Sequence, residues 1–226
     1  MTATAKDIEA RLGSLRDELP PHITLIAVSK THPEDAILAA YHFGQRVFGE
    51  NKVQELVAKA ELLPKDIEWH LIGHLQSNKV KYIVPFVTMI HAIDSLKLLK
   101  EVEKRAANVD RVIDVLLQMH IAEEESKFGF DKTELLALLH STEVQQMNHI
   151  RIRGLMGMAT FTRNEDQIRR EFRSLKQLFH DVKTSFFKEK STFDTLSMGM
   201  SGDYQIAIEE GSTMVRIGSS IFGSRS

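Results

Sequence analysis

Strand-like and helix-like segments alternate along this chain, and the alternation constrains its fold more than any other feature. Short apolar, β-branched runs such as residues 25–29 have the length and composition of buried strands. Segments with apolar residues at helical spacing lie between these runs. We predict strands at residues 25–29, 46–49, 68–73, 89–92, 112–120, 152–158, 192–198 and 214–217. Helical patterns occur at residues 34–43, 52–62, 77–82, 95–107, 132–140, 165–187 and 204–210.

Repeated strand–helix units favour a parallel sheet, because parallel neighbours need a long crossover connection. Together with a helical stripe in residues 1–19, they predict an α/β fold, a (β/α)8 TIM barrel with an extra N-terminal helix. An open doubly wound sheet would give a similar alternation and is the alternative. Because no linker rich in Pro, Gly or Ser divides the 226 residues, we expect a single domain over residues 1–226.

The composition excludes several classes of function. With 29 basic and 31 acidic residues, the chain has no overall field that would favour nucleic acid or a membrane surface, so any anion site must be local. The absence of cysteine excludes disulfides and thiolate chemistry. No apolar window is long enough to span a bilayer. We expect a cytoplasmic monomer that binds neither nucleic acid nor membranes.

Lys30 ends the first predicted strand, and its position is unusual for a cation. Packing does not explain a lysine at the end of a buried strand, and desolvation of its ammonium group should lower its pKa. The neutral amine of such a lysine can condense with a carbonyl to form a Schiff base. The alternative is a lysine whose side chain extends from the strand end into solvent.

Two segments near the C-terminus combine glycines with serine hydroxyls. Residues 197–203 and 216–220 each lie where a strand turns toward a short helix, an arrangement that suits phosphate oxygens. Barrels often bind phosphate after strands seven and eight, although each segment alone also suits an ordinary turn. Arg216 occupies the last predicted strand and needs an acceptor, either in a structural ion pair or on a heteroaromatic nitrogen of a ligand.

Other candidate sites have weaker support. His70 and His74 would share one face of a continuous strand, yet no carboxylate partner accompanies them, so we expect no metal site. The acidic residues 123–125 are expected to form a solvated loop. The basic residues of segment 165–187 alternate with apolar ones, as in an amphipathic helix that packs on the barrel.

Several motifs together resemble one known family. They are AVSK at 27–30, FGEN at 48–51 with Gln54 and Glu55, HLIGHLQSNK at 70–79, HAIDS at 91–95, GLM at 154–156, LSMGMS at 196–201 with Asp203, and RIG at 216–218 with IFG at 221–223. In this order they resemble the pyridoxal phosphate homeostasis protein family, from about the first strand to the C-terminus.

The resemblance implies a barrel like the N-terminal domain of alanine racemases, with pyridoxal 5′-phosphate held on a lysine as an internal aldimine. Carried over by motif, Lys30 would hold the cofactor covalently, and Arg216 would face its pyridine nitrogen. The phosphate contacts would come from Ser201, Gly218 and Ser219. Asn51 would lie near the ring, and the residues that line the pocket less directly would be His70, Met198 and Gly199. Many relatives have threonine where this chain has Ser219, but the hydroxyl is retained.

The expected function is cofactor buffering or delivery without robust catalysis, and apo forms of pyridoxal phosphate enzymes are the candidate recipients. An arginine only donates hydrogen bonds, so it would leave the pyridine nitrogen unprotonated and weaken the ring as an electron sink. A small amino-acid racemase is the alternative, although a two-base racemase needs a second proton donor opposite the lysine. A Schiff-base aldolase that grips a sugar phosphate is a third hypothesis.

Overall fold

Eight parallel strands close into a barrel in this computed structural model, which describes residues 3–123 and 128–223. Each strand pairs with its neighbours in sequence, and β1 pairs with β8 to complete the ring. The strands are β1 (Thr24–Val28), β2 (Val47–Glu50), β3 (Glu68–Leu71), β4 (Met89–Ile93), β5 (Ile113–Gln118), β6 (Ile150–Met156), β7 (Thr195–Met200) and β8 (Met214–Ile217). The predicted barrel is confirmed, and closure excludes the open sheet.

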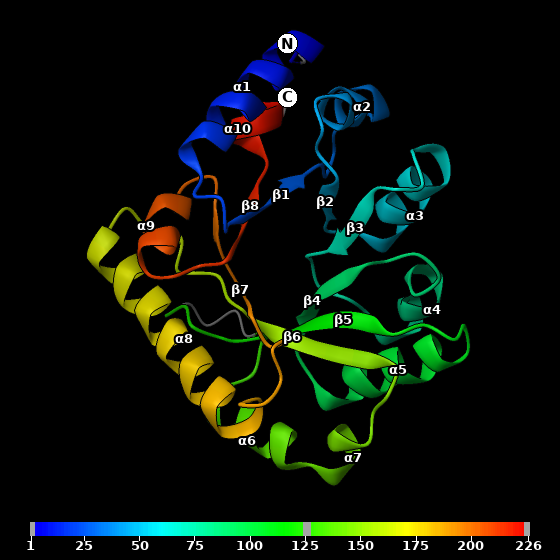
Figure 1. The fold of residues 1–226 in the computed structure, drawn as a ribbon, viewed down its shortest axis with the longest axis vertical. Coiled ribbons are helices and arrows are strands. Elements are labelled where there is room, and N and C mark those ends of the chain that lie inside the picture. Colours follow the sequence, from blue (N-terminus) through cyan, green and yellow to red (C-terminus); the bar gives the residue numbers. More distant parts are fainter. Residues whose placement is uncertain (1–2, 124–127, 224–226) are drawn as a thin grey trace.

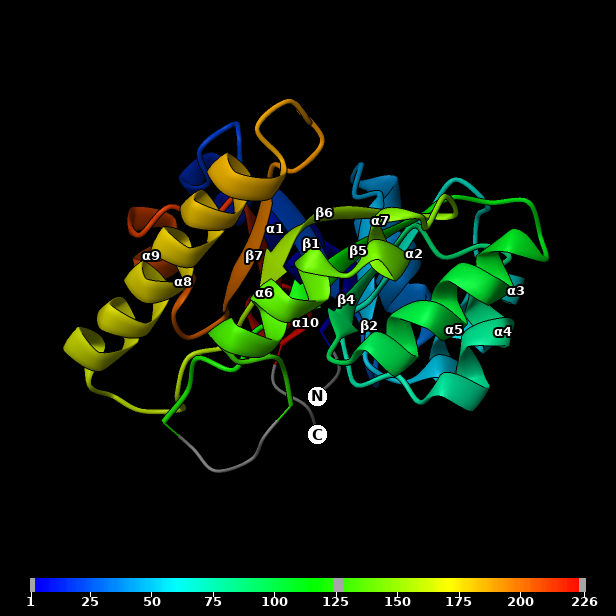
Figure 2. The ribbon, with the colours of Figure 1, turned by 90° about the horizontal axis from the view of Figure 1, so that it is seen from below.

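Helices surround the strands, as Figures 1 and 2 show. They are α1 (Ala5–Glu18), α2 (Glu34–His42), α3 (Val53–Leu62), the 3₁₀ turn Ser77–Lys79, α4 (Val80–Ile83), α5 (Leu96–Ala107), α6 (Lys132–His140), α7 (Thr142–Gln145), α8 (Glu165–Phe186), α9 (Tyr204–Glu209) and α10 (Ser219–Phe222). None of the described helices is long and apolar enough to cross a membrane.

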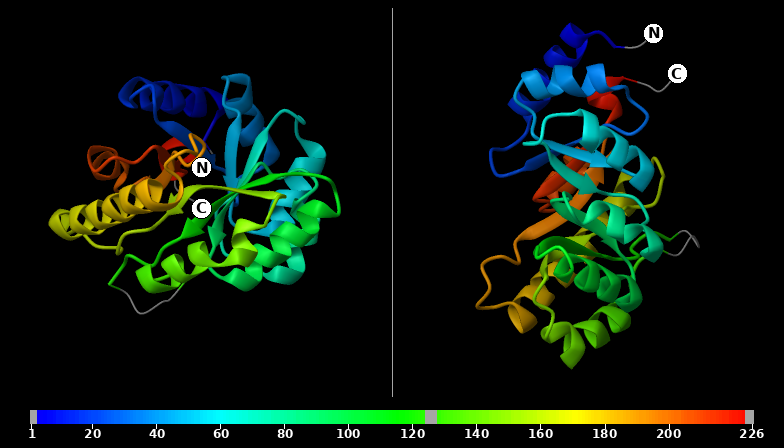
Figure 3. Two further views of the ribbon diagram at one scale, coloured as in Figure 1. Left: turned by 60° about the horizontal axis from the view of Figure 1, so that its bottom comes forward. Right: turned by 90° about the vertical axis from the view of Figure 1, so that its right-hand side faces the viewer.

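The additional N-terminal helix, α1, packs beside the end of the chain. Its first turn is closed by a capping box between Thr4 and Asp7, and its buried stripe consists of Ile8, Leu12 and Leu15. This stripe packs against α2 and α10, so the two ends of the described chain lie close together (Figures 1 and 3).

Apolar side chains form two separate cores. The larger core fills the layer between the strands and the helices. The smaller one lies on the inward faces of the strands and consists of Ile26, Met89, Leu116, Met156 and Met214. Because successive strand residues point to opposite faces, the residues two and four places after an inward residue also face the barrel interior.

The structure corrects several predicted boundaries. Strand β7 continues through Met200, two residues beyond the predicted end at 198, so Gly199 and Met200 belong to the strand and not to the loop that was expected. Strand β3 ends at Leu71, so His74 is not on a strand. Helix α7 was not predicted. The expected acidic loop at 123–125 lies outside the described residues except for Glu123.

Candidate functional site

A cavity of about 430 Å³ opens at the end of the barrel where the strands have their carboxyl ends. This is the end at which barrel enzymes and binding proteins place their chemistry. Six of the nine predicted site residues line the cavity, namely Lys30, Asn51, Ser201, Arg216, Gly218 and Ser219. The predicted covalent anchor, the predicted phosphate contacts and the arginine therefore face the same space, although they come from opposite ends of the chain.

Strand alternation explains why Lys30 and Arg216 share this space. In and after β1, Ile26 belongs to the inner core, and Val28 and Lys30 follow it at intervals of two to line the cavity. In β8, Met214 belongs to the inner core and Arg216 follows two residues later. Ile26 and Arg216 are partners in the β1–β8 register, so closure of the barrel brings the two inward rows side by side.

A buried ion pair fixes the backbone before Lys30. The Lys59 ammonium lies 2.8 Å from Glu50 Oε1 and donates to the Ser29 carbonyl oxygen, also at 2.8 Å. The Ser29 hydroxyl donates to the same Glu50 oxygen at 2.6 Å. Burial raises the pKa of Glu50, and Lys59 and Ser29 oppose that rise by hydrogen bonding. This cluster therefore holds the end of β1 from behind, on the side away from the cavity.

The backbone after Lys30 is held by the same group of charges. Thr31 adopts a left-handed conformation with φ of 66°, which is costly for a β-branched residue. Its N–H donates to Glu55 Oε1 at 2.5 Å, and Glu55 also accepts from Lys59 at 2.7 Å. Lys30 thus lies between two anchored residues, and its backbone position is set by helix α3.

Arg216 lies inside the barrel without a carboxylate at ion-pair distance among residues 3–123 and 128–223. Its Nη1 donates to the Ser197 hydroxyl at 2.6 Å, and its Nη2 donates to the Gly157 carbonyl at 3.1 Å. Burial lowers its pKa to about 10, while Asp203 opposes this shift electrostatically. At neutral pH the guanidinium is therefore charged, and it has N–H groups left for a ligand.

The loops after β7 and β8, which the sequence predicts to hold phosphate, lie side by side in the structure. The Ser201 hydroxyl accepts a hydrogen bond from the Gly218 N–H at 3.2 Å, which joins the two loops. Gly218 packs closely on β1, because a Cβ there would lie 3.0 Å from the Val28 carbonyl oxygen. The N–H groups of Ser219 and Ser220 begin α10 and have no intrahelical acceptor, so they and the serine hydroxyls are donors suited to phosphate oxygens.

The loop between β6 and α8 forms another wall of the cavity. Thr160 lines it, and the Thr160 N–H and hydroxyl both donate to the Glu171 carboxylate at 2.7 Å. Its neighbour Phe161 also lines the cavity, although 98% of that residue is exposed. The loop is therefore fastened to α8 while it presents an aromatic side chain at the cavity mouth.

The other three predicted residues do not line the cavity. Met198 is fully buried in the larger core, between the strands and the helices. Gly199 lies against α9, since a Cβ at this position would be 2.6 Å from the Ala207 Cβ. His70 is buried on β3 and hydrogen-bonds to His91 at 3.0 Å, one layer below the cavity. Their proposed closeness to a ligand was inferred from sequence motifs and stays a prediction.

The two histidines considered as metal ligands belong to different networks. His70 is paired with His91, whereas His74 Nδ1 lies 3.2 Å from Asp94 Oδ2 beyond the strand. In the part of the chain that the structure describes, no three His, Cys, Asp or Glu side chains are grouped for a metal ion.

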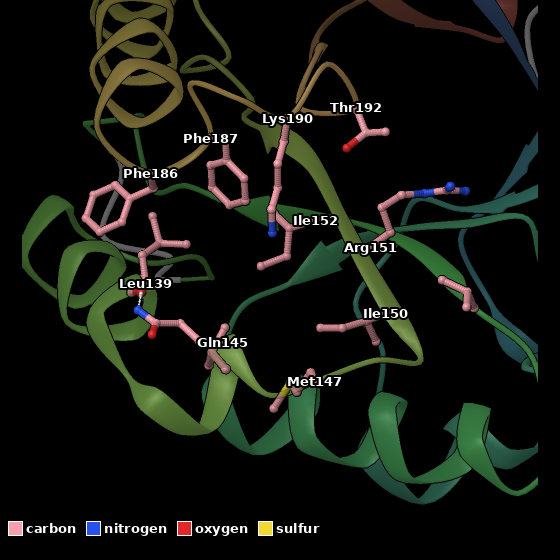
Figure 4. A pocket seen from close by; sticks show the side chains of 12 residues that line it. Leu139, Gln145, Met147, Ile150, Arg151, Ile152, Phe186, Phe187, Lys190 and Thr192 are labelled. Carbon is pink, nitrogen blue, oxygen red and sulfur yellow. Dashed lines mark hydrogen bonds between the residues drawn. The ribbon is translucent and has the colours of Figure 1, made fainter.

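A second cavity of about 430 Å³ lies at the opposite end of the barrel, near the starts of β5, β6 and β7 (Figure 4). Its cations are already engaged: Arg151 donates to Asp114 at 2.6 Å, and Lys190 lies over the Phe187 ring. Gln145 in its wall donates to the Leu139 carbonyl. This end of a barrel generally serves stability, and neither glycine nor serine lines this cavity, in contrast to the cavity at the other end.

The sequence did not predict the residues that support the site without lining the cavity. Lys59 occupies the buried stripe of α3 with Val53 and Leu56, and a cation in an apolar stripe was a signal that could have identified it. His91 and Ser197 gave no comparable signal. Their contact joins β4 to β7 and depends on closure of the barrel.

Comparison with known proteins first defines the class. Residues 4–226 match the family model described as alanine racemase, N-terminal domain. A solved alanine racemase from Bartonella henselae has the same fold, with a TM-score of 0.73 at 15% identity. That match covers 97% of this chain and 59% of the racemase. The fold and the family model thus place the chain among barrels of the alanine racemase type.

Closer relatives identify the family within this class. A pyridoxal phosphate homeostasis protein from Aquifex aeolicus is 40% identical over 202 residues, which cover 89% of this chain and 86% of the relative. The structure of PipY from Synechococcus elongatus with PLP bound is 38% identical, with a TM-score of 0.87 and coverage of 96% and 100%. The chain belongs to the pyridoxal phosphate homeostasis protein family, as its motifs predicted.

The Lys59–Glu50 pair leads to a prediction about stability. Lys59→Met leaves Glu50 buried without its counter-charge, and we expect a loss of about 3–5 kcal/mol in the free energy of unfolding at neutral pH. Lys100→Met, which removes the exposed ion pair with Glu143, should cost less than about 1 kcal/mol. Urea unfolding monitored by circular dichroism measures both values.

The same measurement at lower pH tests the cause. Burial raises the pKa of Glu50 in the folded protein, so the Glu50 carboxyl of Lys59→Met takes up a proton more readily folded than unfolded. The loss of unfolding free energy in Lys59→Met relative to wild type should therefore shrink as pH falls and grow as pH rises. Equal losses for Lys59→Met and Lys100→Met at neutral pH would contradict this role of the pair.

Proposed function

We propose that this protein binds pyridoxal 5′-phosphate on Lys30 and keeps the cofactor in reserve for cellular use. The observation that carries this proposal is the convergence of Lys30, Arg216 and the Ser201–Gly218 cradle on one cavity. When bound, the cofactor supplies an aldehyde carbon to which the lysine amine attaches with loss of water. The PLP-bound structure of the PipY relative supports this choice of ligand.

The residues around the cavity fit the three ends of this cofactor. Hydroxyl and N–H donors of Ser201 and Ser219 suit its phosphate, and Lys30 suits its aldehyde. Arg216, which stays charged and only donates, suits an unprotonated ring nitrogen. Because an unprotonated ring withdraws electrons weakly, this arrangement favours holding the cofactor over turnover of amino acids.

The tyrosines bear on the racemase alternative. None of the three lines the cavity. Tyr204 donates to Glu18 at 2.9 Å, and Tyr41 donates to Asp66 at 2.8 Å. Tyr82 is 53% exposed elsewhere on the surface. A two-base racemase that uses a tyrosine opposite the lysine therefore has no support from the geometry of this chain.

Lys30→Ala tests the covalent anchor. We expect the variant to lose the visible absorbance of the lysine-bound cofactor completely, because no amine remains to attach. Borohydride reduction of wild-type protein, followed by peptide mass spectrometry, should locate the cofactor on Lys30. Lys52→Ala removes an exposed lysine near the site and should retain the absorbance. Label on another lysine in wild-type protein, with far-ultraviolet circular dichroism of both variants unchanged, would contradict the anchor.

Gly218→Ala tests the phosphate cradle. The added Cβ would lie 3.0 Å from the Val28 carbonyl oxygen, so the loop that carries Ser219 must shift. We expect the dissociation constant of pyridoxal phosphate to rise about tenfold, measured by titration in the absorbance of bound cofactor. Gly13→Ala makes the same change on α1, where the nearest atom is 3.4 Å away, and should leave the affinity unchanged. Equal affinities of the two variants would show that the cradle does not hold the phosphate.

A reserve has to release its cofactor, and we propose that apo forms of pyridoxal phosphate enzymes receive it. Loaded protein mixed with an apo-enzyme should restore enzyme activity faster than the same concentration of free cofactor in the presence of a phosphatase that destroys free cofactor. Activation no faster than this control would argue against direct delivery. The cytoplasmic location and the monomeric state expected from the sequence remain predictions.

A further inference from the structure

Three buried polar side chains extend from Arg216 across the interior of the barrel, below the cavity. Ser197 on β7 lies 2.6 Å from Arg216 Nη1, and its hydroxyl oxygen is 3.1 Å from His91 Nδ1 on β4. His91 Nε2 is 3.0 Å from His70 Nδ1 on β3. These residues are at most 4% exposed, and of the four only Arg216 reaches the cavity. Ser197, His91 and His70 therefore connect to the cavity through the arginine.

Arg216 determines the direction of every hydrogen bond in the row that runs from it through Ser197 and His91 to His70. A guanidinium donates and does not accept, so the Ser197 oxygen accepts from Arg216. The hydroxyl proton of Ser197 then goes to His91 Nδ1, its other partner among the described residues. His91 consequently carries its proton on Nε2 and donates it to His70 Nδ1. The opposite direction would leave the proton of the buried Ser197 hydroxyl without an acceptor among the described residues.

Burial keeps both imidazoles neutral. It lowers the pKa of His70 to about 3. It also lowers the pKa of His91 far below the usual value, and the neighbouring His70 and Arg216 lower it further. Neither ring competes with Arg216 for positive charge at neutral pH. The hydrogen-bonded side chains of Ser197, His91 and His70 therefore surround the buried Arg216 cation with neutral dipoles that are all oriented in the same direction.

The guanidinium is held at both of its terminal nitrogens. Nη1 donates to Ser197 and Nη2 donates to the Gly157 carbonyl, which fixes the plane of the group. A planar, fixed donor keeps its remaining N–H groups aimed in one direction. A carboxylate partner in place of Ser197 would have fixed the plane as well, but it would have neutralised the charge that faces the cavity.

We propose that Ser197, His91 and His70 form a one-way hydrogen-bond chain that positions Arg216 as a rigid charged donor toward the ring nitrogen of the cofactor. This inference rests on the proposed function. It assigns positioning roles to three residues that do not line the cavity. It also explains why four polar side chains occupy a part of the barrel interior that would otherwise be apolar.

The tautomers provide the first test, and they need no cofactor. In full-length protein labelled with ¹⁵N-histidine, two-bond ¹H–¹⁵N spectra should show His70 and His91 protonated at Nε2 and bare at Nδ1, without change between about pH 5 and about pH 8. The two signals are assigned by their loss in His70→Asn and in His91→Gln. A His91 protonated at Nδ1, or a charged imidazole at either position, overturns the proposed direction of the chain.

The second test separates positioning from general packing. Ser197→Ala should weaken binding of pyridoxal phosphate about tenfold and shift the absorption maximum of the bound cofactor, because Arg216 loses one of its two fixed acceptors. The carbocyclic analogue, in which C–H replaces the ring nitrogen, should bind wild type and Ser197→Ala within about twofold of each other. Equal weakening for cofactor and analogue would mean a merely structural role and would overturn the proposal.

Two matched variants of His70, the last residue of the hydrogen-bonded row, keep the proposal testable if Ser197→Ala fails to fold. His70→Asn keeps an acceptor oxygen near the position of Nδ1, whereas His70→Leu, of similar size, removes it. We expect His70→Leu to reproduce the spectral shift and weaker binding in part, and His70→Asn to restore both. Identical behaviour of these two variants overturns the proposal.

The tests also separate this inference from the proposed function. If wild-type protein binds neither the cofactor nor the analogue, the proposed function fails, and the role of the chain toward a ring nitrogen fails with it. If wild-type protein binds both and Ser197→Ala weakens binding of the cofactor and of the analogue equally, only the positioning role fails.

Discussion

The pairing of β1 with β8 is the contact on which the rest of this structure depends. Without it, Lys30 and Arg216 would lie on the two free edges of an open sheet. With it, Ile26 and Arg216 become register partners and their strands direct every second side chain into one enclosed space. The packing of Gly218 on Val28 also follows from this closure. The site is thus a property of the closed ring.

Enclosure makes each polar group in the interior costly unless it is paired, and the protein answers this constraint in two ways. Behind Lys30, opposite charges meet in the buried Lys59–Glu50 pair, which holds the backbone. Beneath the cavity, Arg216 is surrounded by neutral donors and acceptors. The first arrangement cancels charge where only rigidity is needed. The second preserves charge where a ligand has to meet it.

The sequence predicted the parts of the molecule that depend on local pattern. The alternation of segments predicted the barrel, and Lys30 stood out as a cation at the end of an apolar strand. The predicted strand ended two residues before the end of β7 because Gly199 resembles a loop residue, whereas pairing of Met200 with Arg216 keeps this segment in the sheet. The bond between His91 and Ser197 joins residues 106 positions apart and has no local signal. Tertiary pairing decided the features that local pattern did not.

Closure of the barrel also determines when the β1–β8 contact can form as the chain is synthesised. Strand β1 is synthesised before the other strands and has one free edge until β8, the last of the eight, arrives to cover it. Contacts between such distant segments form slowly, so the free edge of β1 is exposed to mispairing until β8 has been made. Because Arg216 and Gly218 come from β8 and the loop after it, the cavity is complete only after β8 has paired with β1, and a ligand bound there can stabilise only a chain whose ring has already closed.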